Sequence, residues 1–188
     1  NFRSCFVVEP SISQSVDKVI FNFNKYLSKA YVREAIVKSV NRREIFVKRL
    51  RSNGCLLSGP YFCQSPNNCT DIFPHPYRKD AYKIITNKNP DYKYSESGRT
   101  KKPMLKYKGK QVEFVFIHKK DISPREKKAI QTIIQDIKKI GIDVTKKSIS
   151  QVSWDEILRN RSDWDLAYVT VSQDVASSVE MEYGSNSS

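Results

Sequence analysis

The amino-acid sequence predicts an α/β lobe in which a mixed sheet is flanked by helices. Segments with the two-residue period of strands alternate with segments of helical period along the second half of the chain. The strongest predicted strand, residues 108–119, is apolar on both faces, as is typical of a strand inside a parallel or mixed sheet. With 188 residues, of which 39% are hydrophobic, the chain is long enough to bury one core.

The first predicted element is a strand over residues 16–25. Apolar side chains alternate along it, so we expect Val19, Phe21 and Phe23 to share one buried face.

Residues 32–50 are strongly basic and could form either one rod that lies on phosphates or two amphipathic helices. Asn41 is followed by Glu44 at the spacing of a capping box, which predicts that a second helix starts here. Apolar stripes lie on both sides of this break, at Val32, Ile36, Ser39 and Val40, and then at Ile45, Phe46 and Leu50. The pattern therefore favours two capped helices whose charges lie on their outer faces.

Two insertions are expected in the middle of the chain. Residues 53–76 are rich in glycine, proline and asparagine and predict a loop. A short helix over residues 77–90 should stop before Pro90. Residues 91–110 are polar and lysine-rich, and predict either a hairpin or a flexible segment.

The second half predicts the order β-α-β-α-β. Ser123, Pro124 and Glu126 have the pattern of a helix start, and Gly141 is placed as the left-handed cap that ends this helix. A strand over 142–150 follows.

The predicted elements end with a short helix and a strand. The helix covers residues 153–160, with Ser153 or Gln151 near its cap, and the strand covers 164–172.

Several of these segments, in this order, resemble the family 5 extracellular solute-binding proteins, the oligopeptide-, dipeptide- and nickel-binding components of ABC importers. The family pattern has a strand ending in F-N, a V-R-x-A-I helix leading to [DN]-R, a helix ending K-x-x-G-I-x-V, a tryptophan, and a D-[FYW]-D strand. The matching residues here are Phe21-Asn22, Val32-Arg33, Ala35-Ile36, Asn41-Arg42, Lys139, Gly141-Ile142, Val144, Trp154 and Asp163-Trp164-Asp165.

The resemblance implies a periplasmic-binding-protein-like lobe. Residues 16–188 would form most of the C-terminal-side lobe of a two-lobed protein, with residues 1–15 near the hinge and an N-terminal lobe missing upstream. It further implies a peptide ligand between the lobes, ABC permease subunits as partners, and a periplasmic or extracellular location as a lipoprotein on a bacterial envelope. Neither enzymatic activity nor a cofactor or metal is expected.

The resemblance also implies the ligand contacts. Asp174 lies where peptide-binding relatives have an acidic residue that pairs with the peptide α-ammonium, a charge-assisted hydrogen bond. Tyr168, Ser172 and Gln173 on the same segment are expected to line the site. Arg33 and Arg42 are expected to anchor helix packing and caps.

The charge of the chain supports an alternative function. There are 33 lysines and arginines against 20 acidic residues, a net charge of +13, and such a field attracts polyanions or anionic membranes. Tyrosines and lysines interleave over residues 92–110, as in single-strand binders. A basic nucleic-acid-binding α/β domain is therefore the alternative, although no recognition motif is present and no nucleic acid is expected.

The cysteines predict a disulfide rather than a metal site. Three of the four lie in the 53–76 loop at spacings that match no zinc motif. We expect a bridge between Cys63 and Cys69, with Cys55 and Cys5 unassigned and free thiols as the alternative. An enzyme is disfavoured because G-x-S-x-G, H-E-x-x-H and P-loop motifs are absent and the two histidines lie far apart in sequence.

Overall fold

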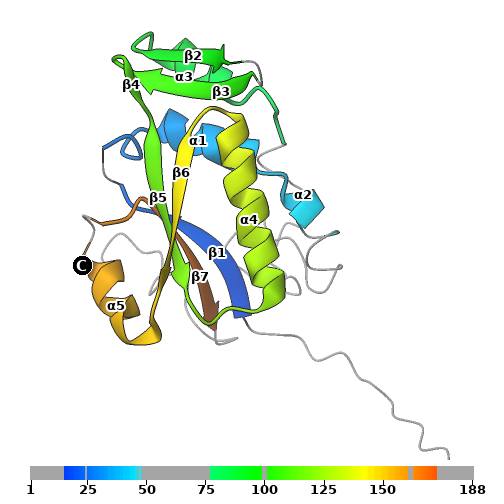
Figure 1. Ribbon diagram of the computed structural model, residues 1–188, viewed down its shortest axis with the longest axis vertical. Coiled ribbons are helices and arrows are strands. Elements are labelled where there is room, and N and C mark those ends of the chain that lie inside the picture. The colour runs from blue at the N-terminus through cyan, green and yellow to red at the C-terminus, as the bar shows by residue number, and fades with distance from the viewer. Residues whose placement is uncertain are drawn as a thin grey trace, which may run out of the picture.

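The chain folds around a four-stranded mixed sheet of order β1-β7-β5-β6 (Figure 1). The structure is a computed structural model and describes residues 15–23, 25–45, 47, 77–98, 101–160 and 163–172. The strands of the sheet are β1 (Ser15–Phe21), β5 (Glu113–Lys119), β6 (Asp143–Ile149) and β7 (Leu166–Ser172). β5 runs parallel to both of its neighbours, and β1 runs antiparallel to β7. The prediction of an α/β lobe with a mixed sheet is confirmed.

Helices cover both faces of this sheet. α4 (Pro124–Lys139) joins β5 to β6, and α5 (Gln151–Arg159) joins β6 to β7. Phe116 of β5 packs in the larger apolar cluster with the isoleucines of α4, whereas its neighbour Ile117 packs in a second cluster with Trp154 of α5. Because successive residues of a strand point to opposite faces, the two helices lie on opposite sides of β5. The predicted order β-α-β-α-β is thus confirmed.

The ends of both helices are set by local hydrogen bonds. Ser123 and Glu126 form the predicted capping box of α4, and Gly141 follows the helix with a φ of +87°. For α5 the cap is Ser150, next to the predicted candidate Gln151, and its Oγ accepts the backbone N–H of Ser153. Hence α5 begins at Gln151, two residues earlier than predicted.

The basic stretch forms two helices, as predicted. α1 (Ala30–Ser39) is separated from α2 (Arg42–Glu44) by Asn41, whose Oδ1 accepts the backbone N–H of Glu44 at 3.0 Å. The second half of the expected capping box was wrong. The backbone N–H of Asn41 donates to the buried carboxylate of Asp136 on α4, and this bond docks the junction of the two helices against α4.

One face of β1 agrees with the prediction only in part. Val19 and Phe21 pack against the larger cluster, but the Phe23 side chain is 63% exposed. Beyond Phe21, the next residue, Asn22, is buried: its backbone N–H donates to the backbone oxygen of Asp165 and its Nδ2 donates to that of Trp164. Phe23 lies beyond the end of β1, where the guanidinium of Arg33 lies 4.5 Å from the centroid of its ring.

A second, smaller sheet lies at the other end of the molecule from the carboxyl ends of β5 and β7 (Figure 1). It consists of β2 (Tyr92–Ser97), β3 (Lys102–Tyr107) and β4 (Lys110–Gln111), and α3 (Tyr82–Lys88) packs against it. Of the two alternatives for residues 91–110, the hairpin is therefore the one observed.

Several predictions lie outside the described residues. These are the loop 53–76 with Cys55, Cys63 and Cys69, the N-terminal Cys5, and the end of the second basic helix. Within the described ranges, no helix combines the length and apolarity needed to cross a bilayer.

Candidate ligand-binding crevice

The candidate site lies where β5 and β7 separate. The two parallel strands are paired at Phe116–Leu166 and Ile117–Ala167, while β7 remains paired with β1 as far as Ser172. β5 ends at Lys119, and the chain then turns into α4. In open α/β sheets, ligands bind outside the carboxyl ends of the strands, which is where this separation occurs.

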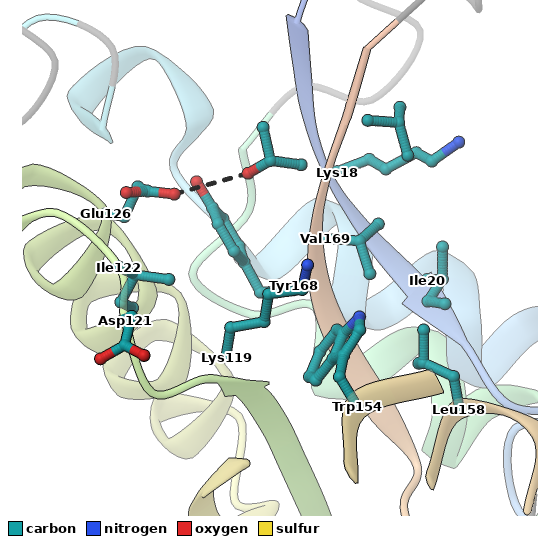
Figure 2. A pocket seen from close by; sticks show the side chains of 12 residues that line it. Lys18, Ile20, Lys119, Asp121, Ile122, Glu126, Trp154, Leu158, Tyr168 and Val169 are labelled. Atoms are coloured by element: carbon teal, nitrogen blue, oxygen red, sulfur yellow. Dashed lines mark hydrogen bonds between the residues drawn. The ribbon is translucent and has the colours of Figure 1, made fainter. Parts of the chain in front are cut away.

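A crevice of about 440 Å³ lies between the separating strands (Figure 2). Its apolar wall comes from β1, β7, α5 and the turn before α4, and comprises Ile20, Ile122, Trp154, Leu158, Val169 and Val171. Its polar side chains are Lys18, Lys119, Asp121, Glu126, Tyr168 and Thr170. A mostly apolar wall with a few converging polar groups is the usual composition of a small-ligand site.

On the α4 side, Thr170 of the crevice contacts two carboxylates, Glu126 in the crevice lining and Asp17 next to it. Thr170 Oγ1 lies 2.7 Å from Asp17 Oδ1 on β1 and 3.4 Å from Glu126 Oε1 on α4. The other oxygen of Glu126 accepts the backbone N–H of Ser123, so the capping box also orients this carboxylate toward β7.

Tyr168 completes this acidic side. Its side chain is buried and its hydroxyl is hydrogen-bonded to Asp17. Burial, followed by the charges of Asp17 and Glu126, raises the pKa of the phenol far above its usual range. The hydroxyl therefore stays protonated and serves as a hydrogen-bond donor.

The opposite side of the crevice is basic. Lys119 of β5 lies over the Trp154 ring, 5.7 Å from its centroid, and Lys18 of β1 lines the same side. The crevice thus has carboxylates on one side and ammonium groups on the other, a polarity that suits a zwitterionic ligand.

Of the predicted ligand residues, the structure places Tyr168 in the crevice and Ser172 at the end of β7, paired with Ser15. Gln173 and Asp174 lie outside the described residues, so their role stays a prediction. Arg33 does anchor its helix: its Nη1 donates to the carbonyls of Leu27 and Ser28 in the turn before α1.

The sequence did not point to Asp17 or to a ligand role for Glu126. They come together only because β1 pairs with β7, and the partners Asp17 and Thr170 are 153 residues apart in the chain. The available signal was the strand period of two residues. Asp17 lies two residues before Val19, so both side chains are expected on the same face of β1.

Comparison with solved structures gives a consistent result. The oligopeptide-binding protein AppA from Bacillus subtilis, solved in complex with a nonapeptide, superimposes with a TM-score of 0.72 at 18% identity, covering 90% of this chain and 33% of that one. The chain has the fold of a solute-binding-protein lobe. Its resemblance to the family 5 solute-binding proteins is confirmed at the level of fold.

Two further solved structures show this solute-binding-protein fold. NikZ from Campylobacter jejuni, in complex with Ni(L-His), gives a TM-score of 0.67 at 17% identity and covers 86% of this chain and 30% of that one. DppA from Helicobacter pylori, in complex with the peptide STSA, gives 0.65 at 17% identity and covers 89% and 29%. DppA is a periplasmic binding protein associated with an ABC transporter.

The chain spans about a third of the length of the solved structures it matches. No protein-family model and no curated protein sequence matches it.

Proposed function

We propose that this chain forms most of one lobe of the substrate-binding component of an ABC importer, and that its crevice forms one wall of a peptide site. The observation that carries the proposal is the crevice at the separating ends of β5 and β7, acidic on one side and basic on the other. Solved structures with the same fold hold peptides in two of the three cases described above. A permease as partner, a periplasmic or extracellular location and envelope attachment belong to the same proposal.

The proposed lobe extends over residues 16–188, with residues 1–15 next to the hinge. Asp174 follows Ser172 by two residues, and β7 runs toward the crevice. In this arrangement the carboxylate of Asp174 binds the peptide α-ammonium, and Tyr168, Ser172 and Gln173 lie beside it. The disulfide between Cys63 and Cys69 remains part of the proposal.

The nucleic-acid alternative loses its aromatic support in the structure. Tyr92 is buried, Tyr94 stacks on Tyr82 of α3 at 3.7 Å, and Tyr107 packs against Tyr26. The interleaved pattern is thus the alternation of a strand whose tyrosines point inward, away from any nucleobase.

Native mass spectrometry of the full-length protein, purified without denaturation, tests the peptide proposal. We expect a series of bound masses that sequence as short peptides after release. Asp174→Ala should weaken binding of a recovered peptide by about tenfold or more, because a buried ammonium loses its charged partner. The matched control is Asp91→Ala, which removes the same charge near the small sheet. An empty protein that binds no peptide on addition, or equal losses for both variants, would contradict the proposal.

A further inference from the structure

The small sheet β2-β3-β4 has two chemically different faces. One face carries aromatic and aliphatic side chains that pack on α1, α3 and the core: Tyr92, Tyr94, Leu105 and Tyr107. The register places Lys93 directly opposite Lys106 and Ser97 opposite Lys102 on the other face. Lys93 and Lys102 are exposed and Lys106 is half-buried. We call the face that carries these three lysines the lysine face.

The lysine face belongs to the most basic part of the described chain. Residues 88–98 and 101–110 contain seven lysines and two acidic residues. Within the described residues, only one of these lysines forms an ion pair, Lys108 with Asp91 at 3.8 Å. Lys102 lies within electrostatic range of Asp143, and of the other lysines all but the half-buried Lys106 are exposed or at the surface of the sheet.

This arrangement is unfavourable for folding, which indicates another role. Lys93 and Lys106 are like charges directly opposite each other on neighbouring strands, a destabilising pair. The turns of the sheet also place lysine at Lys101 and Lys108, each with a φ of +47°, where glycine, asparagine or aspartate is favoured. Lysine thus occupies positions that neither pairing nor turn geometry favours.

The lysine face is remote from the crevice and from the points where the described chain leaves the main sheet. Ser15 and Ser172 are paired at the carboxyl end of β7. The small sheet lies at the opposite end of the molecule (Figure 1). A ligand in the crevice therefore leaves the lysine face accessible.

The chemistry of the lysine face identifies its occupant. Single-stranded nucleic acid requires aromatic platforms, but the tyrosines of this sheet point inward. Protein interfaces are depleted of lysine. Lysines spread over a sheet instead suit a planar array of negative charge, to which each ammonium adds attraction independently of geometry. We propose that the lysine face docks on the anionic headgroup surface of a lipid bilayer.

Vesicle cosedimentation of the 188-residue chain tests this proposal independently of any peptide ligand. The vesicles are phosphatidylcholine alone, or phosphatidylcholine with one-third phosphatidylglycerol. The first variant replaces Lys93, Lys102 and Lys106 by glutamine. The control variant removes the same charge from exposed positions of α4 and β6 with Lys127→Gln, Lys128→Gln and Lys146→Gln.

We expect the wild-type chain to bind only the anionic vesicles and to dissociate as salt increases. The lysine-face variant should bind at least about tenfold more weakly, because each lost lysine removes a surface attraction, while the control loses about threefold or less. Equal losses would show that net charge alone acts and would overturn the proposal. Equal binding to both kinds of vesicle would also overturn the proposal. So would displacement of the chain from anionic vesicles by an oligonucleotide whose phosphate concentration is lower than the concentration of anionic lipid.

Discussion

Gly141 provides the sharpest test of how the two sheets are joined. It follows α4 with a φ of +87°, and its carbonyl accepts the backbone N–H of Leu105 at 2.7 Å and Nε2 of Gln111 at 2.8 Å. A Cβ at this position would lie 2.6 Å from the nitrogen of Leu105 and 2.8 Å from the carbonyl carbon of Met104. Because both are backbone atoms of β3, the small sheet would have to move away from α4.

Gly141→Ala is therefore expected to destabilise the protein by two additive effects. The left-handed backbone costs alanine about 1–2 kcal/mol, and the overlap with β3 adds about 1–3 kcal/mol. Together they give about 2–5 kcal/mol, equivalent to a fall in Tm of roughly 4–20 °C for a chain of this size. Urea and thermal unfolding followed by circular dichroism measure both quantities.

Gly109→Ala is the matched control. Gly109 has a similar φ of +82°, but nothing lies within 4 Å of the position of a Cβ. This variant keeps the backbone penalty without the overlap, and should cost about 1–2 kcal/mol. If both variants lose the same stability, the close approach of Gly141 to β3 does not hold the sheets together, and the reasoning is refuted.

Three further outcomes are expected. Lys93→Glu should raise the free energy of unfolding by about 0.2–1 kcal/mol in urea titrations, because it places a carboxylate opposite Lys106; an unchanged or lower value would contradict the register. Trp154→Ala should cost about 3–5 kcal/mol, because the buried indole fills the cluster under α5; a loss below about 1 kcal/mol would show that the cluster is dispensable. The hydrogen bond to Asp136 raises the pKa of Lys139 in the folded state. The contribution of this bond to the free energy of unfolding is therefore complete below pH 10.5 and is lost as the pH rises through the higher pKa of the folded state. Lys139→Met should therefore unfold at a lower urea concentration than the wild type at neutral pH and at nearly the same one above that pKa, and a difference that persists there would exclude this pairing.

The elements predicted best are those with local determinants. The start and end of α4 depend on Ser123, Glu126 and Gly141, which lie within or next to the helix, and all three have the predicted roles. Phe23 was misplaced because β1 ends at Phe21, next to a contact of Asn22 with Trp164, which is far away in the sequence. Non-local contacts of this kind leave no periodicity in the chain.

The same distinction explains what was missed at the candidate site. Glu126 was predicted as a capping residue, and its contact with Thr170 depends on how β5 and β7 diverge. At Asn41 a local partner was predicted and a distant one is observed. The backbone N–H was expected to donate to the side chain of Glu44, but it donates to the buried carboxylate of Asp136. Local patterns give the elements, while the crevice requires their topology.

The pairing of β1 with β7 has a consequence for folding kinetics. It joins residues as far apart as Asp17 and Thr170, so a very long loop must close before the edge strand can form. Since Ser15 lies opposite Ser172, a circular permutant that links β7 to β1 through a tight turn would convert this distant pairing into an ordinary β-hairpin. Such a permutant should keep the same sheet order and reach it faster, because the described strand pairing with the greatest sequence separation would have become one of the most local.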